Sequence, residues 1–189
     1  TQMLYYARLK SSTKDYQFKD INLNDCLGEV LEDYAPLLEE KQFVIINKLQ
    51  SETVYTDRRG LQFMLGQIVS NAIKYSSDSP MLTISMIHSE IADVLSVEDN
   101  GMGMSEDVVR NILVDNNKVP KHGSGVGVIN VHSRIKLMFG SEYGLKVYSE
   151  PDEGTKVVIH IPAIPYTEEN RERLERQDFG RGMATDEEE

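Results

Sequence analysis

The stretch QIVSNAIKY, residues 67–75, combines an apolar face with polar side chains at helical spacing. Gln67, Asn71 and Lys74 are separated by four and three positions, so in a helix they share one face. The buried side of the same helix is formed by Ile68, Val69, Ala72 and Ile73. An Asn carbonyl oxygen and a Lys ammonium suit a magnesium-bound phosphate. The alternative interpretation is an amphipathic helix with a solvated polar face.

A second candidate motif is EDNGMGM, residues 98–104, which follows a segment with strand character. Asp99 at the end of a strand can accept a hydrogen bond from an exocyclic amine. Gly101 and Gly103 let a flat base pack against the backbone. The motif therefore predicts a purine pocket, and the alternative is an ordinary Asp-Asn-Gly turn after a strand.

The third candidate is HGSGVGVINV, residues 122–131, with glycines at Gly123, Gly125 and Gly127. The glycines let backbone N–H groups approach an anion, and the N-terminus of the following apolar helix favours negative charge. The stretch has neither the spacing of a dinucleotide fingerprint nor the Lys of a P-loop. By itself it fits a phosphate site or a glycine-rich turn that caps a helix.

Hydrophobic periodicity predicts an α/β two-layer sandwich, with helices on one side of a mixed or antiparallel sheet. Helices are expected at 23–40, 57–76, 105–113 and 126–139. Strands are expected at 43–49, 54–56, 81–88, 93–99, 145–150 and 155–162. Asn22 or Asn24 can cap the first helix, and Asp57 can cap the second.

Composition predicts a soluble globular domain with flanking ends. The chain has 189 residues, 40% of them hydrophobic, and a single cysteine, Cys26, which excludes an internal disulfide framework. The net charge is -11, of which -5 belongs to residues 167–189. The sequence has no basic stripe with interleaved aromatics, so nucleic acid is not an expected partner.

Together the three motifs resemble the N, G1 and G2 boxes of the GHKL, or Bergerat-fold, ATP-binding family. This family includes sensor histidine kinases, type II topoisomerases, mismatch-repair ATPases and Hsp-class chaperones. The resemblance covers residues 14–163 and includes a closing Gly154-Thr155 before the last strand. It implies an α+β two-layer sandwich that binds ATP and Mg²⁺.

The resemblance also implies roles for individual residues. Asp99 binds the adenine amine, Asn71 ligates Mg²⁺, and Lys74 contacts phosphate. Met104 lies beneath the adenine ring, and Tyr75 flanks it. The base pocket is completed by Gly101, Gly103 and Thr155. The turn from the ATP lid into the next helix holds Gly123, Gly125 and Gly127.

NAIKYS and residues 3–34 are similar to the kinase branch of the family. This similarity implies the end of a dimerisation helix and a linker at 1–13, the catalytic domain at 14–163 and a charged, flexible tail at 164–189. Residues 4–9 and 54–76 particularly resemble the small membrane kinases that sense antibiotics such as bacitracin. Residues 123–162 look more like kinases of the LytS and YesM type.

The implied function is transfer of the ATP γ-phosphate to a histidine on an upstream dimerisation domain, for relay to a response-regulator aspartate. Gln67 stands where related ATPases usually place a Glu to activate water, which a kinase does not need. A Gln there is compatible with poor ATP hydrolysis and retained transfer, and the alternative interpretation is a weakened catalyst. The implied setting is the cytoplasmic domain of a membrane protein that forms a homodimer and acts on a cognate response regulator.

The chain has four histidines, His88, His122, His132 and His160. None of them has the sequence context of a phosphoacceptor, so the acceptor is expected upstream of Thr1. Two alternatives stay open at this point. One is a GHKL ATPase or a serine kinase of the anti-sigma type, and the other is a non-catalytic nucleotide-binding docking module.

Overall fold

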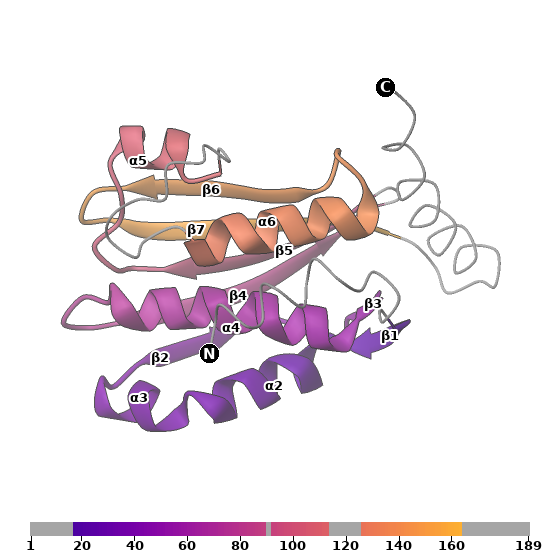
Figure 1. Ribbon diagram of the computed structural model, residues 1–189. Helices are drawn as coiled ribbons and strands as arrows, with labels where there is room; N and C mark the ends of the chain where they lie inside the picture. The colour runs from indigo at the N-terminus through magenta and orange to yellow at the C-terminus, as the bar shows by residue number, and fades with distance from the viewer. Residues whose placement is uncertain (1–16, 90–91, 114–125, 164–189) are drawn as a thin grey trace.

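A computed structural model describes residues 17–89, 92–113 and 126–163 (Figure 1). The expected dimerisation-helix segment 1–13 and the tail 164–189 lie outside the described residues, as do Gly123 and Gly125. The domain boundaries expected from the sequence therefore stay predictions.

The main sheet is five-stranded and mixed, with the order β2-β4-β5-β7-β6. Its strands are β2 (Val44–Asn47), β4 (Met81–His88), β5 (Ala92–Asp99), β6 (Gly144–Glu150) and β7 (Gly154–Pro162). The β2–β4 pair is parallel, and the β4–β5, β5–β7 and β6–β7 pairs are antiparallel. A separate antiparallel ribbon is formed by β1 (Phe18–Asn22) and β3 (Thr53–Asp57).

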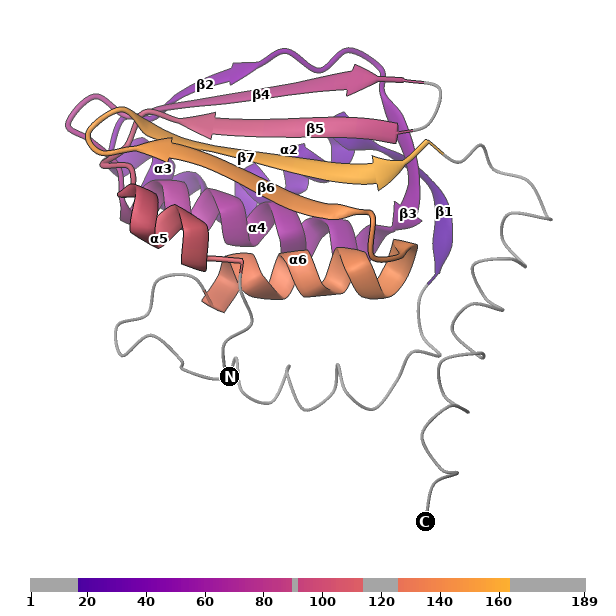
Figure 2. The same ribbon diagram turned by 90° about the horizontal axis from the view of Figure 1, so that it is seen from above.

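The helices cover one face of this sheet, as Figure 2 shows from above. The long helices α2 (Leu23–Asp33), α4 (Arg58–Lys74) and α6 (Val126–Phe139) lie side by side, with α4 in the middle. Short helices α3 (Ala35–Glu40) and α5 (Glu106–Asn111) lie toward one end of the sheet. The predicted α+β two-layer sandwich with a mixed sheet is confirmed.

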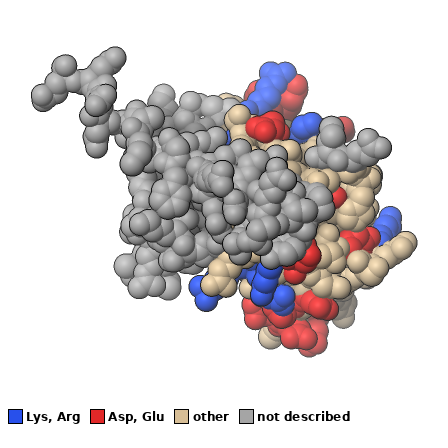
Figure 3. Space-filling model, turned by 90° about the vertical axis from the view of Figure 1, so that its right-hand side faces the viewer, with Lys and Arg blue, Asp and Glu red and all other residues tan. Residues whose placement is uncertain are grey.

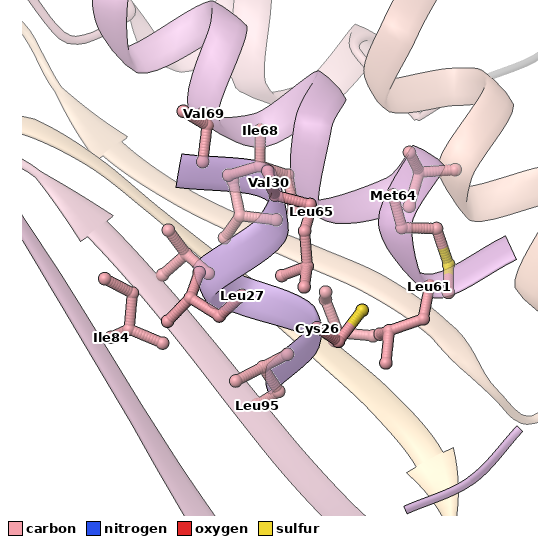
Figure 4. Close-up of a cluster of buried hydrophobic side chains, with 14 of the residues drawn as sticks. Cys26, Leu27, Val30, Leu61, Met64, Leu65, Ile68, Val69, Ile84 and Leu95 are labelled. Atoms are coloured by element: carbon pink, nitrogen blue, oxygen red, sulfur yellow. The ribbon is translucent and has the colours of Figure 1, made fainter. Parts of the chain in front are cut away.

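The core fills the space between the helices and the sheet (Figure 4). Helix α4 supplies its largest stripe, because its apolar residues recur at helical spacing along the side that faces the strands. The buried cluster in Figure 4 includes Cys26, Leu27, Val30, Leu61, Met64, Leu65, Ile68, Val69, Ile84 and Leu95. The stripe fixes the rotation of α4, so its polar side chains point away from the core.

The expected single helix at 23–40 is wrong in one respect, because it is divided into α2 and α3 at Tyr34. Pro36 lies in the first turn of α3, where its missing N–H group costs nothing. A continuous helix would have brought the Pro36 ring against a carbonyl group one turn earlier. The cap of α2 is Asn22, whose side chain accepts the Asp25 N–H at 3.1 Å.

Asp57 joins the start of α4 to two other parts of the molecule. Its carboxylate accepts hydrogen bonds from the N–H groups of Gly60, at 2.6 Å, and Gln17, at 3.1 Å. The Arg134 guanidinium on α6 lies 3.9 Å away, and both side chains are buried. This buried ion pair links the N-terminus of α4, which carries most of the QIVSNAIKY stretch, to α6, which begins at Val126.

On the face shown in Figure 3, the described Lys and Arg side chains lie close to Asp and Glu side chains. Such mixing of both signs is typical of a solvated protein surface.

Asp57→Ala is expected to lower the free energy of unfolding by about 3 kcal/mol, because it removes the cap of α4 and the carboxylate beside buried Arg134. Urea denaturation followed by circular dichroism measures the change. The matched control is Asp20→Ala, at an exposed position of β1, which is expected to change stability by less than about 0.5 kcal/mol. Equal effects of the two substitutions would contradict this role for Asp57.

Candidate functional site

A cavity of about 380 Å³ opens between α4, the ends of β5 and β7, and helices α5 and α6. Six of the residues that the sequence singled out line it: Asn71, Tyr75, Asp99, Gly103, Met104 and Thr155. They come from α4 and its C-cap residue, from the end of β5 and the segment after it, and from β7, so folding brings together residues that are far apart in the sequence. Gln67, Lys74, Gly101 and Gly127 are not among the lining residues.

Asp99 is the last residue of β5, and the antiparallel register places it opposite Thr155 on β7. Its carboxylate Oδ1 accepts the N–H of Gly101 at 2.9 Å. Burial raises the pKa of this carboxyl above its ordinary value, and backbone hydrogen bonds from Gly101 and Thr155 offset part of that rise. A partly buried carboxylate is therefore held at the cavity wall, and its remaining lone pairs can accept hydrogen bonds from a ligand.

The backbone after β5 lies too close to its neighbours to admit side chains at two positions. A Cβ on Gly101 would lie 2.4 Å from the carbonyl oxygen of Tyr75. Gly103 has a φ of +64°, and a Cβ there would lie 1.8 Å from the carbonyl oxygen of Glu150. Glycine is thus required at both positions of the GMGM motif, for close approach at the first and for close approach and backbone conformation at the second.

The same loop is anchored by hydrogen bonds at both ends. The Met102 N–H donates to the carbonyl of Tyr75 at 2.9 Å, and the Met104 N–H donates to Ser149 Oγ on β6 at 2.9 Å. Asn100 points away from the cavity, since its side chain bonds the backbone of Ser79 and Met81. The loop that carries the glycines is therefore fixed between α4 and the sheet.

The polar face of α4 is divided between the cavity and the neighbouring helix. Asn71 lines the cavity, whereas Lys74 is exposed and lies with its Nζ 4.9 Å from the centre of the Tyr75 ring. Gln67 packs against α6, where a Cβ on Gly127 would lie 2.5 Å from its Oε1. Gly127 therefore allows α6 to approach α4 closely, and the predicted role of Gln67 in chemistry stays untested.

Sequence reasoning did not identify most of the cavity wall as part of a site. The additional lining residues are Ile68, Met102, Ser105, Val108, Ile112, Val128, Val147 and Val157. Most are apolar, so the cavity combines hydrophobic walls with the polar groups of Asp99, Thr155 and Asn71. Such a combination fits a flat, largely apolar ring that carries a few hydrogen-bonding groups.

Within residues 17–89, 92–113 and 126–163, no group of three or more His, Cys, Asp or Glu side chains is arranged to hold a metal ion. The Asn71 amide is a hard oxygen donor at the cavity, but one such donor does not make a closed metal site. Any divalent cation at Asn71 needs further oxygen ligands from a bound molecule or from water.

The family match and the fold place the chain in the GHKL class of ATP-binding domains. Residues 56–165 match the family described as "Histidine kinase-, DNA gyrase B-, and HSP90-like ATPase", and the chain belongs to this family. Membership implies that the chain binds ATP.

The chain is similar to sensor histidine kinases. It is 26% identical over 162 residues to the sensor histidine kinase YxdK of Bacillus subtilis, covering 82% of this chain and 49% of that protein. It is 40% identical over 68 residues to the sensor histidine kinase YesM of Bacillus subtilis, covering 36% of this chain and 10% of that protein. The chain thus spans half or less of these relatives.

Solved structures agree on the fold. The Acinetobacter baumannii histidine kinase AdeS aligns with a TM-score of 0.67 at 21% identity, covering 87% of this chain and 75% of that one. Among the helices that the structure describes, none is long and apolar enough to span a membrane.

Asp99→Asn is expected to raise the free energy of unfolding at neutral pH. Because burial raises the folded-state pKa of Asp99, the wild-type protein loses stability as pH rises from the ordinary value of 3.8 through the raised value. The neutral Asn side chain avoids this cost and keeps an oxygen acceptor for the Gly101 N–H.

Urea denaturation at neutral and mildly acidic pH tests the sign, and the stability gain should shrink toward acidic pH. Exposed Asp78 supplies the control, because Asp78→Asn should change stability by less than about 0.5 kcal/mol. A large loss of stability in Asp99→Asn at neutral pH would show that the Asp99 charge supports the fold.

Proposed function

We propose that this chain is the ATP-binding catalytic domain of a sensor histidine kinase. It binds ATP with Mg²⁺ and transfers the γ-phosphate to a histidine on a dimerisation domain, from which a response-regulator aspartate takes it. The observation that carries the proposal is the convergence of Asn71, Asp99 and Thr155 on one cavity in a chain similar to sensor kinases.

In this proposal the apolar cavity takes the adenine ring. The Asp99 carboxylate accepts a hydrogen bond from the exocyclic amine, and Thr155 lies beside it on the neighbouring strand. Gly101 and Gly103 keep side chains out of the loop next to the base. Met104 and Tyr75 line the same cavity, as expected for side chains that contact the ring.

The triphosphate extends from the base toward the polar face of α4 and the start of α6. Asn71 offers its carbonyl oxygen to Mg²⁺, which usually completes its coordination with phosphate oxygens and water. Bound Mg²⁺ would neutralise part of the negative charge of the triphosphate. Lys74 has an exposed side chain that can reach a phosphate. Gly127 lies in the first turn of α6, whose N-terminus favours an anion, and the roles expected for Gly123 and Gly125 fall outside the described residues.

The side chain at position 67 favours transfer over hydrolysis. An amide cannot remove a proton from water, so Gln67 cannot act as a general base. Its oxygen also lies against Gly127 on α6, which supports a role in helix packing. Catalysis by this chain then consists of positioning and charge neutralisation, with the acceptor histidine as nucleophile.

The rest of the kinase lies outside the described residues. Because the chain spans 49% of YxdK, we propose that it is part of a longer protein that also holds a dimerisation domain. The partners are that domain, a second copy of the protein and a cognate response regulator. The full-length protein is then membrane-anchored, with this domain in the cytoplasm.

Asp99→Asn should weaken ATP binding at least about tenfold, because it replaces a charged hydrogen-bond acceptor with a neutral amide. Isothermal titration calorimetry with ATP and Mg²⁺ measures the affinity. Gly101→Ala should also weaken binding, since its Cβ would displace the loop from the Tyr75 carbonyl.

Gly28→Ala on α2 is the matched glycine control, because a Cβ there meets no atom within 4 Å. It should leave ATP affinity unchanged and stabilise the helix by about 0.5–1 kcal/mol. ATP binding that is unaffected by Asp99→Asn would refute the proposed base pocket.

Phosphotransfer is tested by mixing the chain with a separately prepared dimerisation domain from a relative and radiolabelled ATP. The account predicts acid-labile label on the histidine of that domain, and Asn71→Ala should abolish the label. Tight ATP binding without transfer, even in the full-length protein, would favour a nucleotide-binding docking module.

A further inference from the structure

Ser149 lies behind the cavity wall, where three backbone segments meet. Its Oγ is 2.9 Å from the Met104 nitrogen, 2.6 Å from the Gly154 carbonyl oxygen and 3.0 Å from Thr155 Oγ1. Met104 and Thr155 line the cavity, whereas Ser149 does not. Any effect of Ser149 on a bound ligand therefore passes through these two residues.

The three contacts fix which atom donates in each hydrogen bond. A serine hydroxyl has one hydrogen and two lone pairs. The Met104 N–H can only donate and the Gly154 carbonyl can only accept, so Ser149 gives its one hydrogen to Gly154, the nearest partner. The remaining lone pair of Ser149 is left for Thr155, which must act as the donor.

This assignment determines what Thr155 offers to the cavity. Its single hydroxyl hydrogen is directed at Ser149, so Thr155 Oγ1 presents only lone pairs to a ligand. Asp99, opposite Thr155 in the strand register, is also an acceptor. The Asp99 and Thr155 side chains, which lie opposite each other at this edge of the cavity, thus accept hydrogen bonds from a ligand and do not donate them.

We propose that Ser149 is a positioning residue that makes the cavity select adenine nucleotides over nucleotides with a carbonyl oxygen in place of the amine. An exocyclic amine can donate to Asp99 and Thr155, whereas a carbonyl oxygen would place lone pairs against lone pairs. The inference rests on the proposed function, because it assumes that the cavity takes the base of ATP.

Ser149→Ala frees the Thr155 hydroxyl to donate into the cavity. The ratio of ATP affinity to inosine triphosphate affinity, measured by calorimetry with Mg²⁺, should fall about three- to tenfold. Inosine triphosphate is the probe because its base carries an oxygen at the position of the adenine amine. Its N1 also carries a hydrogen that adenine lacks, so the test compares the affinity ratio of Ser149→Ala with that of the wild type, and not the ratio alone. If Ser149 had a purely structural role, Ser149→Ala would weaken the binding of both nucleotides equally and leave the affinity ratio unchanged.

Variants of Thr155 show whether Ser149 acts through it. Thr155→Val removes the hydroxyl and should itself lower the ratio, and adding Ser149→Ala to Thr155→Val should change the ratio no further. Thr155→Ser keeps the hydroxyl and should preserve the affinity ratio. If Ser149→Ala does not fold, the comparison of Thr155→Ser with Thr155→Val still tests whether the hydroxyl sets the ratio. Ser85→Ala on β4, away from the cavity, is the serine control.

The outcomes separate this inference from the proposed function. Wild-type binding of ATP that depends on Asp99, together with an unchanged ratio in Ser149→Ala, would overturn the role of Ser149 alone. A wild-type chain that binds neither nucleotide would overturn both. A lower ratio in Ser149→Ala that disappears in the Thr155→Val background supports the inference.

Discussion

The antiparallel pairing of β5 with β7 is the constraint on which the candidate site depends. This register places Asp99 opposite Thr155 at one end of the central strands. At the same end, the chain leaves β5 through a loop whose glycines lie against the carbonyl groups of Tyr75 and Glu150. A shift of one residue would turn Asp99 toward the opposite face of the sheet, away from α4.

Helix α4 completes the site because its apolar side packs against the core and so fixes the orientation of its polar side. Its apolar stripe packs on the sheet, and Asp57 holds its first turn to Arg134 on α6. The orientation of Asn71 toward the cavity follows from that packing. The close approach of Gln67 to Gly127 brings α6 beside α4, so Val128 can add to the apolar wall. Stability and site geometry thus depend on the same helix contacts.

The sequence predicted the five strands of the main sheet, β3, the long helices and the layer arrangement because each of these elements has its own hydrophobic period, but strand β1 was not among the expected strands. It did not predict the break before Pro36 or the parallel pairing of β2 with β4, which local periodicity does not specify. The motifs identified the polar residues of the cavity. Val108, Val147 and Ser149 carry no local signal of a site, because their roles arise only when β6, α5 and the loop after β5 meet.

The most direct test of the account is a crystal structure of the chain with Mg²⁺ and a non-hydrolysable ATP analogue. The account predicts that the adenine ring lies in the cavity, with its exocyclic amine within hydrogen-bonding distance of the Asp99 carboxylate and the triphosphate beside Asn71. A nucleotide bound elsewhere, or a base held outside the cavity with Asp99 uncontacted, would contradict it.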